Sequence, residues 1–263
     1  MIAFTAEQEA FRRAVARFVD AEVAPQADAI DERGEFPREP FKRIGAHGWL
    51  GLRYPEQYGG ADADMTTYCL FAEELARGSL SLAAAAAMQS LMGTYFVYKY
   101  GSEALRARYL TPALRGDLVA TFALTEPDAG SDVAAITTRA ERRGDRWVLR
   151  GTKTWVTSAP VADMLTVAAK TSDERGLKNI ALFLLDRSTM RGITLGKAID
   201  KMAVRGSVSR SLARSRVRTA ARCAATIHRV AVPGSPSRSR SRRPESRDKH
   251  LPGSAPAATV CNR

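Results

Sequence analysis

The hydrophobic pattern of this chain changes once, between Pro112 and Val119, and this change is the strongest constraint on its fold. Before it, apolar residues recur at helical spacing; after it, short apolar and β-branched runs are separated by turn residues. The two patterns follow one another instead of alternating, which is typical of an α+β protein. We expect an N-terminal α-helical bundle domain at residues 1–118 and a β-barrel-like or β-sandwich middle domain at residues 119–206.

Several signals mark helix boundaries in the first 118 residues. Thr5 and Gln8 have the spacing of a capping box ahead of an amphipathic segment. Asp64 is a suitable N-cap for another helix. An Ala-rich stretch at residues 82–100 has strong helix propensity and a nearly continuous apolar surface. We expect this stretch to lie in the middle of the helical bundle.

Strand-length runs fill the next part of the chain. The tripeptide Arg143-Gly144-Asp145 predicts a turn between two of them. The expected strands are residues 119–124, 146–149, 154–157, 164–168, 180–185 and 193–195.

The net charge of +12 is concentrated at the end of the chain. Residues 207–263 hold 13 Lys and Arg against 2 Asp and Glu, which leaves 27 against 26 for residues 1–206. A basic chain often binds nucleic acid or an anionic surface, but the part expected to fold is almost neutral. Residues 207–263 combine Arg, Ser, Pro and Ala without any aromatic residue, so we expect a disordered basic tail.

Cysteine usage and the N-terminus narrow the class of protein. Cys69, Cys223 and Cys261 are far apart and lack metal-ligand spacing, so we expect no metal site. The N-terminus has no apolar core of a signal peptide, and no run approaches the 18 apolar residues of a membrane span. These features predict a cytoplasmic protein that does not interact with a membrane.

Two segments carry the pattern of a binding site. FALTEPDAGSD, at residues 122–132, follows a predicted strand with small and polar residues whose backbone can approach and hydrogen-bond a flat polar ring. GTKTWVT, at residues 151–157, places a Trp near hydroxyl side chains on a second strand, which suits a planar heterocycle. The dinucleotide, P-loop and hydrolase motifs are absent from the sequence.

Four motifs in order make residues 1–207 resemble the acyl-CoA dehydrogenase family. The resemblance implies an FAD-dependent enzyme that dehydrogenates an acyl-CoA thioester between Cα and Cβ, with hydride passing to flavin N5. It also implies an electron-transfer flavoprotein-type acceptor and, in intact family members, a homo-oligomer. The motifs are PEQYGG at residues 55–60, LTEPDAGSD at 124–132, DRWVLRGTKTWVTSA at 145–159 and DKMAVRGS at 200–207.

The resemblance assigns the flavin to the two binding segments. The first would cradle the isoalloxazine ring with its backbone and Thr, and the second would pack on the ring with its Thr hydroxyl near the redox edge. Ser131 is also implied to contact the acyl-CoA substrate. Asp128 stands where the family most often has Gly and is a tolerated turn residue. The implied cofactor-binding residues are Phe122, Ala123, Leu124, Thr125, Gly130, Ser131, Trp155, Val156 and Thr157.

The resemblance ends at Ser207, before the second helical domain that holds the family's catalytic glutamate. No residue here resembles that glutamate, so we expect a truncated or frameshifted product that is inactive alone and has no catalytic residue of its own. Residues 235–247, SPSRSRSRRPESR, have two interpretations. They are an RS-type segment that binds nucleic-acid phosphates on a non-catalytic scaffold, or the out-of-frame translation of a GC-rich gene. The basic tail starts abruptly at residue 207, inside a family motif, and this favours the second interpretation.

Overall fold

The computed structural model describes residues 3–144, 146–174, 176–188, 192–219 and 224–226. Every described residue lies within one compact unit, Met1–Arg229. Residues 235–247 lie outside the described residues, so both interpretations of that segment stay predictions.

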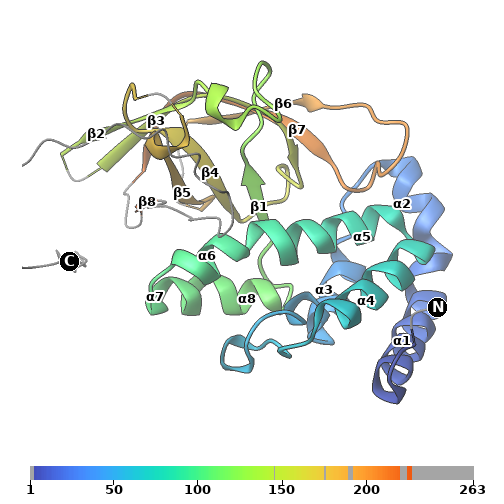
Figure 1. The fold of residues 1–263 in the computed structure, drawn as a ribbon. Coiled ribbons are helices and arrows are strands. Elements are labelled where there is room, and N and C mark those ends of the chain that lie inside the picture. The colour runs from blue at the N-terminus through green and yellow to red at the C-terminus, as the bar shows by residue number, and fades with distance from the viewer. Residues whose placement is uncertain (1–2, 145, 175, 189–191, 220–223, 227–263) are drawn as a thin grey trace, which may run out of the picture. The chain divides into compact units, whose positions relative to one another are not determined.

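The described residues before residue 119, which we call the helical part, form a helical bundle (Figure 1). The predicted capping box is confirmed, since Thr5 and Gln8 each accept a hydrogen bond from the other's backbone N–H. Asp64 caps the next predicted helix by accepting from the N–H of Thr67 at 2.7 Å. The α-helices are α1 (Ala6–Phe18), α2 (Ala27–Arg33), α3 (Arg38–Ala46), α4 (Met65–Gly78), α5 (Leu80–Ala87), α6 (Tyr95–Tyr100), α7 (Glu103–Leu105) and α8 (Thr111–Leu114).

The predicted Ala-rich helix is present but interrupted. A π-helical segment, Met88–Gly93, separates α5 from α6. The whole stretch Leu80–Tyr100 is long and apolar enough, by length and composition, to cross a membrane, which the sequence analysis did not anticipate. Half of it is buried inside the protein, as in a core helix, so its length and composition are weak evidence for a membrane span.

Gln89 in the π-helical segment joins the helices to the first strand. Its side chain is buried and donates to the carbonyls of Ala113 and Leu118, both at 2.8 Å. Its Oε1 accepts from the N–H of Ala120 at 2.7 Å. One side-chain amide therefore satisfies three backbone groups at the point where helix gives way to strand.

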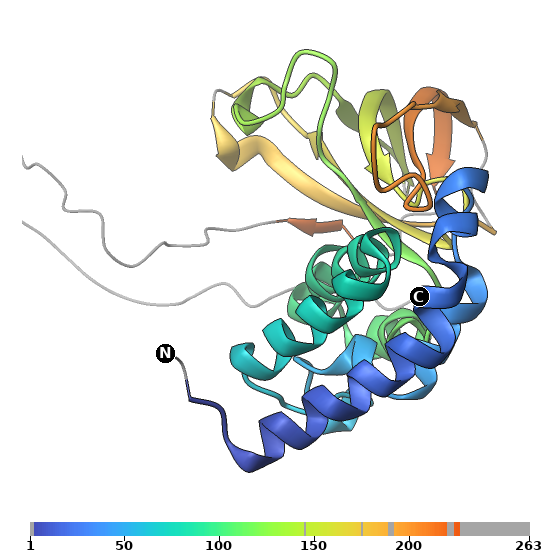
Figure 2. The same ribbon diagram turned by 90° about the vertical axis from the view of Figure 1, so that its right-hand side faces the viewer.

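The described residues from 119 to 226, which we call the sheet part, form one curled eight-stranded sheet (Figures 1 and 2). The strand order is β6-β7-β3-β2-β4-β5-β8, and β1 pairs with β4 in parallel. The predicted α+β class, helical bundle first and curled sheet second, is confirmed. The strands are β1 (Ala120–Ala123), β2 (Arg139–Arg143), β3 (Arg146–Thr157), β4 (Met164–Lys170), β5 (Ile180–Asp186), β6 (Ile193–Ala198), β7 (Ser209–Thr219) and β8 (Ala224–Thr226).

Strand β4 is buried on both faces of the sheet. Leu165 and Val167 are buried in one apolar cluster with β3 and β5 residues. Met164 and Ala168, which alternate with them, are buried in two other clusters that include residues of the helical part. A strand buried on both faces is an almost continuous apolar run, as the sequence of β4 is.

Strand β7 corrects the prediction of disorder from residue 207. Ser209–Thr219 pairs with β3 and β6, and Ala224–Thr226 pairs with β5. The prediction of disorder was based on the average composition of residues 207–263. A strand that pairs on both sides, as β7 does with β3 and β6, can form without a high average hydrophobicity. Leu212 shows this, since it is almost completely buried in the sheet core although Arg and Ser surround it in sequence.

The DKMAVRGS motif connects the sheet part to the helical part. Asp31 of α2 accepts hydrogen bonds from the N–H groups of Arg205 at 2.9 Å and Gly206 at 3.3 Å, and from the Ser81 hydroxyl at 2.5 Å. The Ser81 hydroxyl lowers the pKa of Asp31 most; burial opposes this and the two backbone donors add to it. The motif therefore has a structural role in holding residues 200–207 on α2 and α5.

Candidate functional site

The C-terminal end of β3 has a strained backbone that exposes Trp155. Trp155 and Ser158 have φ values of 56° and 60°, which non-glycine residues rarely adopt. The pairing of β3 with β7 shifts register between Lys153 and Val156, as in a β-bulge. Bulges turn side chains out of the regular alternation, and Trp155 is 56% exposed. Strain of this kind, about 1–3 kcal/mol per residue, is concentrated at functional sites.

The loop after β1 lies against this end of β3. The two segments are the ones that the sequence analysis assigned to the flavin, and the structure brings them side by side. Thr154 N donates to Thr125 O at 2.8 Å, and Lys153 Nζ donates to Leu124 O at 2.8 Å and to Glu126 Oε1 at 2.7 Å. The hydroxyl of Thr121 in β1 also donates to Thr157 O at 2.5 Å.

The loop itself is a tight turn with an open outer side. The N–H of Glu126 donates to Ala129 O at 2.9 Å, and the N–H of Ala129 donates back to Glu126 O at 3.2 Å. A Cβ built on Gly130 would meet no atom within 4 Å. The segment that follows the turn, Gly130 and Ser131, is therefore free of protein packing on that side and accessible to a ligand.

The predicted site residues differ in what they present. The side chains of Ala123 and Val156 are buried in the sheet core, so only their backbone groups can face a ligand. The ring of Phe122 packs against Phe96 of α6, with centroids 4.8 Å apart. The more accessible predicted residues are Trp155, Gly130 and Ser131, which are exposed, and Leu124, Thr125 and Thr157, which are half-buried. Their individual contacts with a flavin stay predictions.

A buried ion pair lies beneath the loop. Lys153 Nζ is 2.7 Å from Glu126 Oε1, and the two side chains are only 1% and 2% exposed. The same Oε1 accepts from Thr138 N at 2.9 Å, while Oε2 accepts from the N–H and hydroxyl of Thr137 at 2.6 and 2.7 Å. Burial by itself would raise the pKa of Glu126, but the hydrogen bonds from Lys153, Thr137 and Thr138 outweigh it and lower the pKa to about 2.

Sequence reasoning did not single out Glu126 or Lys153, although both lie inside the quoted motifs. The available signal was weak, because Glu126 shares its motif with Asp128 and Asp132, and Lys153 lies 27 positions further along the chain. Buried charges of this kind are almost always paired. The sequence does not reveal which partner each charge takes, since that depends on the fold.

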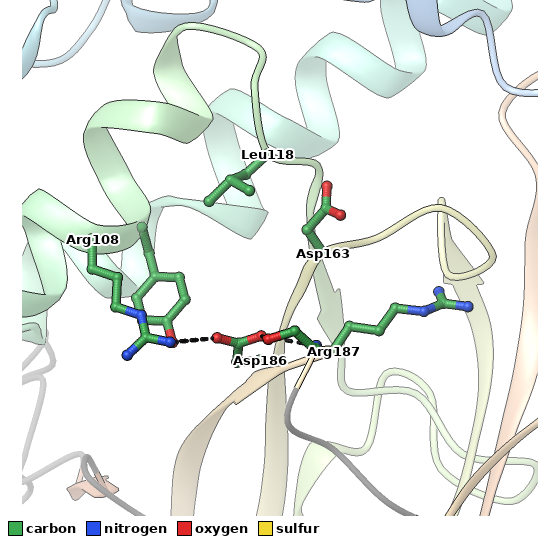
Figure 3. A pocket seen from close by; sticks show the side chains of 7 residues that line it. Arg108, Leu118, Asp163, Asp186 and Arg187 are labelled. Carbon is green, nitrogen blue, oxygen red and sulfur yellow. Dashed lines mark hydrogen bonds and ion pairs between the residues drawn. The ribbon is translucent and has the colours of Figure 1, made fainter.

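A pocket of about 450 Å³ lies between the π-helical segment Arg106–Leu110 and the ends of β4 and β5 (Figure 3). None of the predicted flavin residues lines it. Arg108 and the hydroxyl of Tyr109 both donate to Asp186 Oδ2 at 2.9 Å. Arg187 donates to the carbonyls of Ala159 and Pro160, so it is also engaged by the protein. These charged groups of the pocket therefore already have hydrogen-bond partners within the protein.

Among the described residues, no group of three or more His, Cys, Asp or Glu could hold a metal ion.

The chain matches two family models that together cover both parts of the fold. Residues 5–117 match the acyl-CoA dehydrogenase N-terminal domain, and residues 121–217 match the acyl-CoA dehydrogenase middle domain. The second match extends into β7, which agrees with the strand at Ser209–Thr219.

Individual relatives are similar to the same region. Benzylmalonyl-CoA dehydrogenase of Aromatoleum aromaticum is 47% identical over 200 residues, which cover 76% of this chain and 52% of the relative. The mitochondrial short-chain specific acyl-CoA dehydrogenase of Homo sapiens is 37% identical over 195 residues, which cover 74% of this chain and 47% of the relative. The chain thus spans about half the length of these curated relatives.

Solved structures agree with the family models. Butyryl-CoA dehydrogenase from Megasphaera elsdenii has a TM-score of 0.77 at 29% identity, covering 83% of this chain and 58% of that one. A glutaryl-CoA dehydrogenase from Mycobacterium smegmatis, solved in complex with FADH2, has a TM-score of 0.75 at 33% identity, covering 82% of this chain and 54% of that one.

Proposed function

Because the chain belongs to the acyl-CoA dehydrogenase family, we propose that its described residues form the FAD-binding part of an enzyme that dehydrogenates an acyl-CoA thioester. The observation that carries the proposal is the exposed Trp155, held by a strained backbone beside the open loop at Gly130 and Ser131. Folding alone does not explain this arrangement, because exposing a large aromatic ring and straining the backbone both cost free energy.

The residues present fit an isoalloxazine ring. The indole of Trp155 supplies an aromatic face, and the half-buried hydroxyls of Thr125 and Thr157 lie on the two adjoining segments. The open side of the loop allows a planar ring to approach the backbone closely. When bound, FAD supplies the redox chemistry by accepting a hydride, and these residues orient the ring and exclude water from it. A solved relative described in complex with FADH2 supports this assignment.

The proposed substrate is an acyl-CoA thioester, with Ser131 in contact with it. Ser131 is exposed on the same loop as the proposed flavin contacts, so a group bound there would lie next to the ring. The relatives are named as dehydrogenases of CoA thioesters, which supports this substrate class. An electron-transfer flavoprotein-type acceptor and self-association belong to the same proposal, and an electron-transferring flavoprotein structure is among the similar ones.

Glu126 is not suited to be the base that removes the α-proton. It is buried, ionised and bound by Lys153 and two Thr residues, and its pKa of about 2 lies far below the working range of a general base. We therefore propose that the described residues bind and orient FAD and substrate, and that proton abstraction depends on another group.

Two measurements test the proposed function. Titrating the chain with FAD should quench Trp fluorescence to saturation, and failure to bind FAD would contradict the proposal. Mixing the FAD-loaded chain anaerobically with saturated acyl-CoAs of several lengths should leave flavin absorbance unchanged. Rapid bleaching with any of them would show that a base is present within residues 1–263, and the assignment of proton abstraction to another group would be abandoned.

A further inference from the structure

Glu126 and Lys153 join three segments at one point beneath the proposed flavin loop. Lys153 of β3 binds the carbonyl of Leu124 and the carboxylate of Glu126. That carboxylate in turn accepts from Thr137 and Thr138, which precede β2. The carboxylate accepts four hydrogen bonds, from Lys153 Nζ, from the N–H of Thr138, and from the N–H and the hydroxyl of Thr137. The loop cannot shift relative to β3 without breaking these bonds.

Burying the Glu126–Lys153 ion pair in this part of the core requires desolvation of two charged groups. Replacing a buried pair by apolar residues of similar volume is often neutral or stabilising, because desolvation offsets the attraction between the charges. Removing one partner is strongly destabilising, since it leaves the other charge buried and unpaired. A gain in net stability is therefore a poor explanation for a buried ion pair at this position. A requirement for one particular backbone geometry explains the pair better.

The geometry that the pair holds is that of the candidate site. Two consecutive loop carbonyls, of Leu124 and Thr125, are both turned toward β3, where they accept from Lys153 Nζ and Thr154 N. Trp155 follows directly in sequence with its positive φ. The orientation of the loop backbone and the position of the exposed indole are therefore set by adjacent residues of a single strand.

We propose that the Glu126–Lys153 pair is a positioning unit that holds the loop at residues 124–131 in the orientation required to bind the flavin. The inference rests on the proposed function, in which this loop receives FAD. Neither side chain is exposed enough to touch the cofactor, so the pair acts on the flavin only through the loop and β3. Its loss should loosen the loop and weaken FAD binding even where the rest of the fold is intact.

Glu126→Gln is the first test variant, with Glu74→Gln as its matched control. The amide has the size of the carboxylate but presents an NH2 group to donors on one side. Glu74 is also a buried carboxylate, bound by Arg12 and Arg77, but it lies on α4 in the helical part. The double variant Glu126→Gln/Lys153→Met removes both charges together, so it leaves no buried charge unpaired and guards against failure to fold.

Two readouts separate the positioning role from the proposed function. Hydrogen–deuterium exchange without FAD should be about tenfold faster or more at residues 122–131 in Glu126→Gln and in the double variant, but not in Glu74→Gln. The Kd for FAD should rise by about tenfold or more in the first two variants, as expected for the loss of a charge-assisted hydrogen bond, and by less than about twofold in the control. The visible circular dichroism of bound FAD should change in the same two variants.

The outcomes are distinct. Unchanged exchange at residues 122–131 in both test variants would overturn the positioning role, whether or not FAD binds. Faster exchange with an unaltered Kd and dichroism would show that the pair orders the loop but does not serve the flavin, which also overturns the inference. A wild-type chain that fails to bind FAD would overturn the proposed function and the flavin role together, while the exchange data would still decide whether the pair holds the loop.

Discussion

Trp155 and Val156 are neighbours with opposite roles, and the difference is set by one bulge. Val156 is buried in the sheet core, and Trp155 is exposed with a φ of 56°. In a regular strand, adjacent side chains also point to opposite faces, and β4 of this sheet is buried on both faces. The bulge and the positive φ let a large ring leave the core at this point.

Trp155→Gly should separate stability from binding. Glycine adopts positive φ without strain, so the variant should unfold at the same or a higher denaturant concentration, with a gain of up to about 1 kcal/mol. FAD binding should weaken strongly, because the aromatic face is lost. Val156→Ala is the control, and it should lose about 2 kcal/mol of stability through the core cavity. Equal FAD affinity in Trp155→Gly and the wild type would contradict the role given to the indole.

The ionisation of Glu126 makes a pH-dependent contribution to stability. Its pKa falls from an ordinary value of 4.5 to about 2 in the folded protein. A lowered folded pKa stabilises the protein above pH 4.5, and this contribution is lost as the pH falls from 4.5 toward 2. Its size is on the order of 3 kcal/mol.

Glu126→Gln should therefore flatten the acid side of the stability curve. Free energies of unfolding, measured with urea between pH 3 and pH 7, should differ most from the wild type at neutral pH and converge as the pH falls. Glu39→Gln, at an exposed carboxylate of α3, controls for the general effect of removing a charge. Parallel curves for the wild type and Glu126→Gln would show that the carboxylate is not held as described.

At the scale of elements, the interrupted helix α5–α6 is shaped by its contact with β1. Gly93 ends the π-helical segment, and a Cβ added there would lie 2.7 Å from Ala120 atoms of β1. Gln89 of the same segment binds the backbone on both sides of the helix-to-strand change. The helix approaches the strand closely because Gly93 has no side chain.

Gly93→Ala should destabilise the protein by about 1–3 kcal/mol through overpacking, since backbone atoms of β1 cannot move away easily. Gly130→Ala is the matched control, because a Cβ at that position meets no atom within 4 Å. The control should change stability by less than about 0.5 kcal/mol. Urea unfolding of both variants measures the difference, and similar values for the two would contradict the close approach at β1.

At the scale of the whole molecule, the described residues all belong to the compact unit Met1–Arg229. Contacts distant in sequence hold that unit together: Asp31 with Gly206, Gln89 with Ala120, and Arg108 with Asp186. The remaining residues, 230–263, carry seven Lys and Arg against two Asp and Glu.

A chain that ends at residue 229 should retain the thermal midpoint and FAD affinity of the full chain. It should bind single-stranded nucleic acid more weakly than the full chain at low salt, because it lacks the seven Lys and Arg of residues 230–263 that are available for phosphates. Fluorescence anisotropy with a labelled oligonucleotide at several salt concentrations measures this. Salt-dependent binding by the full chain would favour the interpretation of residues 235–247 as a functional basic segment.

The local sequence was sufficient to predict a helical part followed by a strand part, the caps at Thr5 and Asp64, and the two segments that the structure brings side by side. It did not predict β2 as a strand, and it divided β3 into two strands. These features depend on periodicity, capping chemistry and motifs within a few residues, so neighbours in sequence determine them. Strand β7 was missed because its pairing depends on the exposed edges of β3 and β6, which no local composition reveals.

Tertiary structure alone decided which groups meet. The partnership of Glu126 with Lys153, the turn of Trp155 out of the core and the contact of Gly93 with Ala120 all depend on distances between segments that are far apart in the chain. The pKa of a charged side chain and the steric role of a glycine both depend on the neighbours that the fold places beside them. The sequence by itself therefore determined the family and the architecture, and packing determined how the site is held.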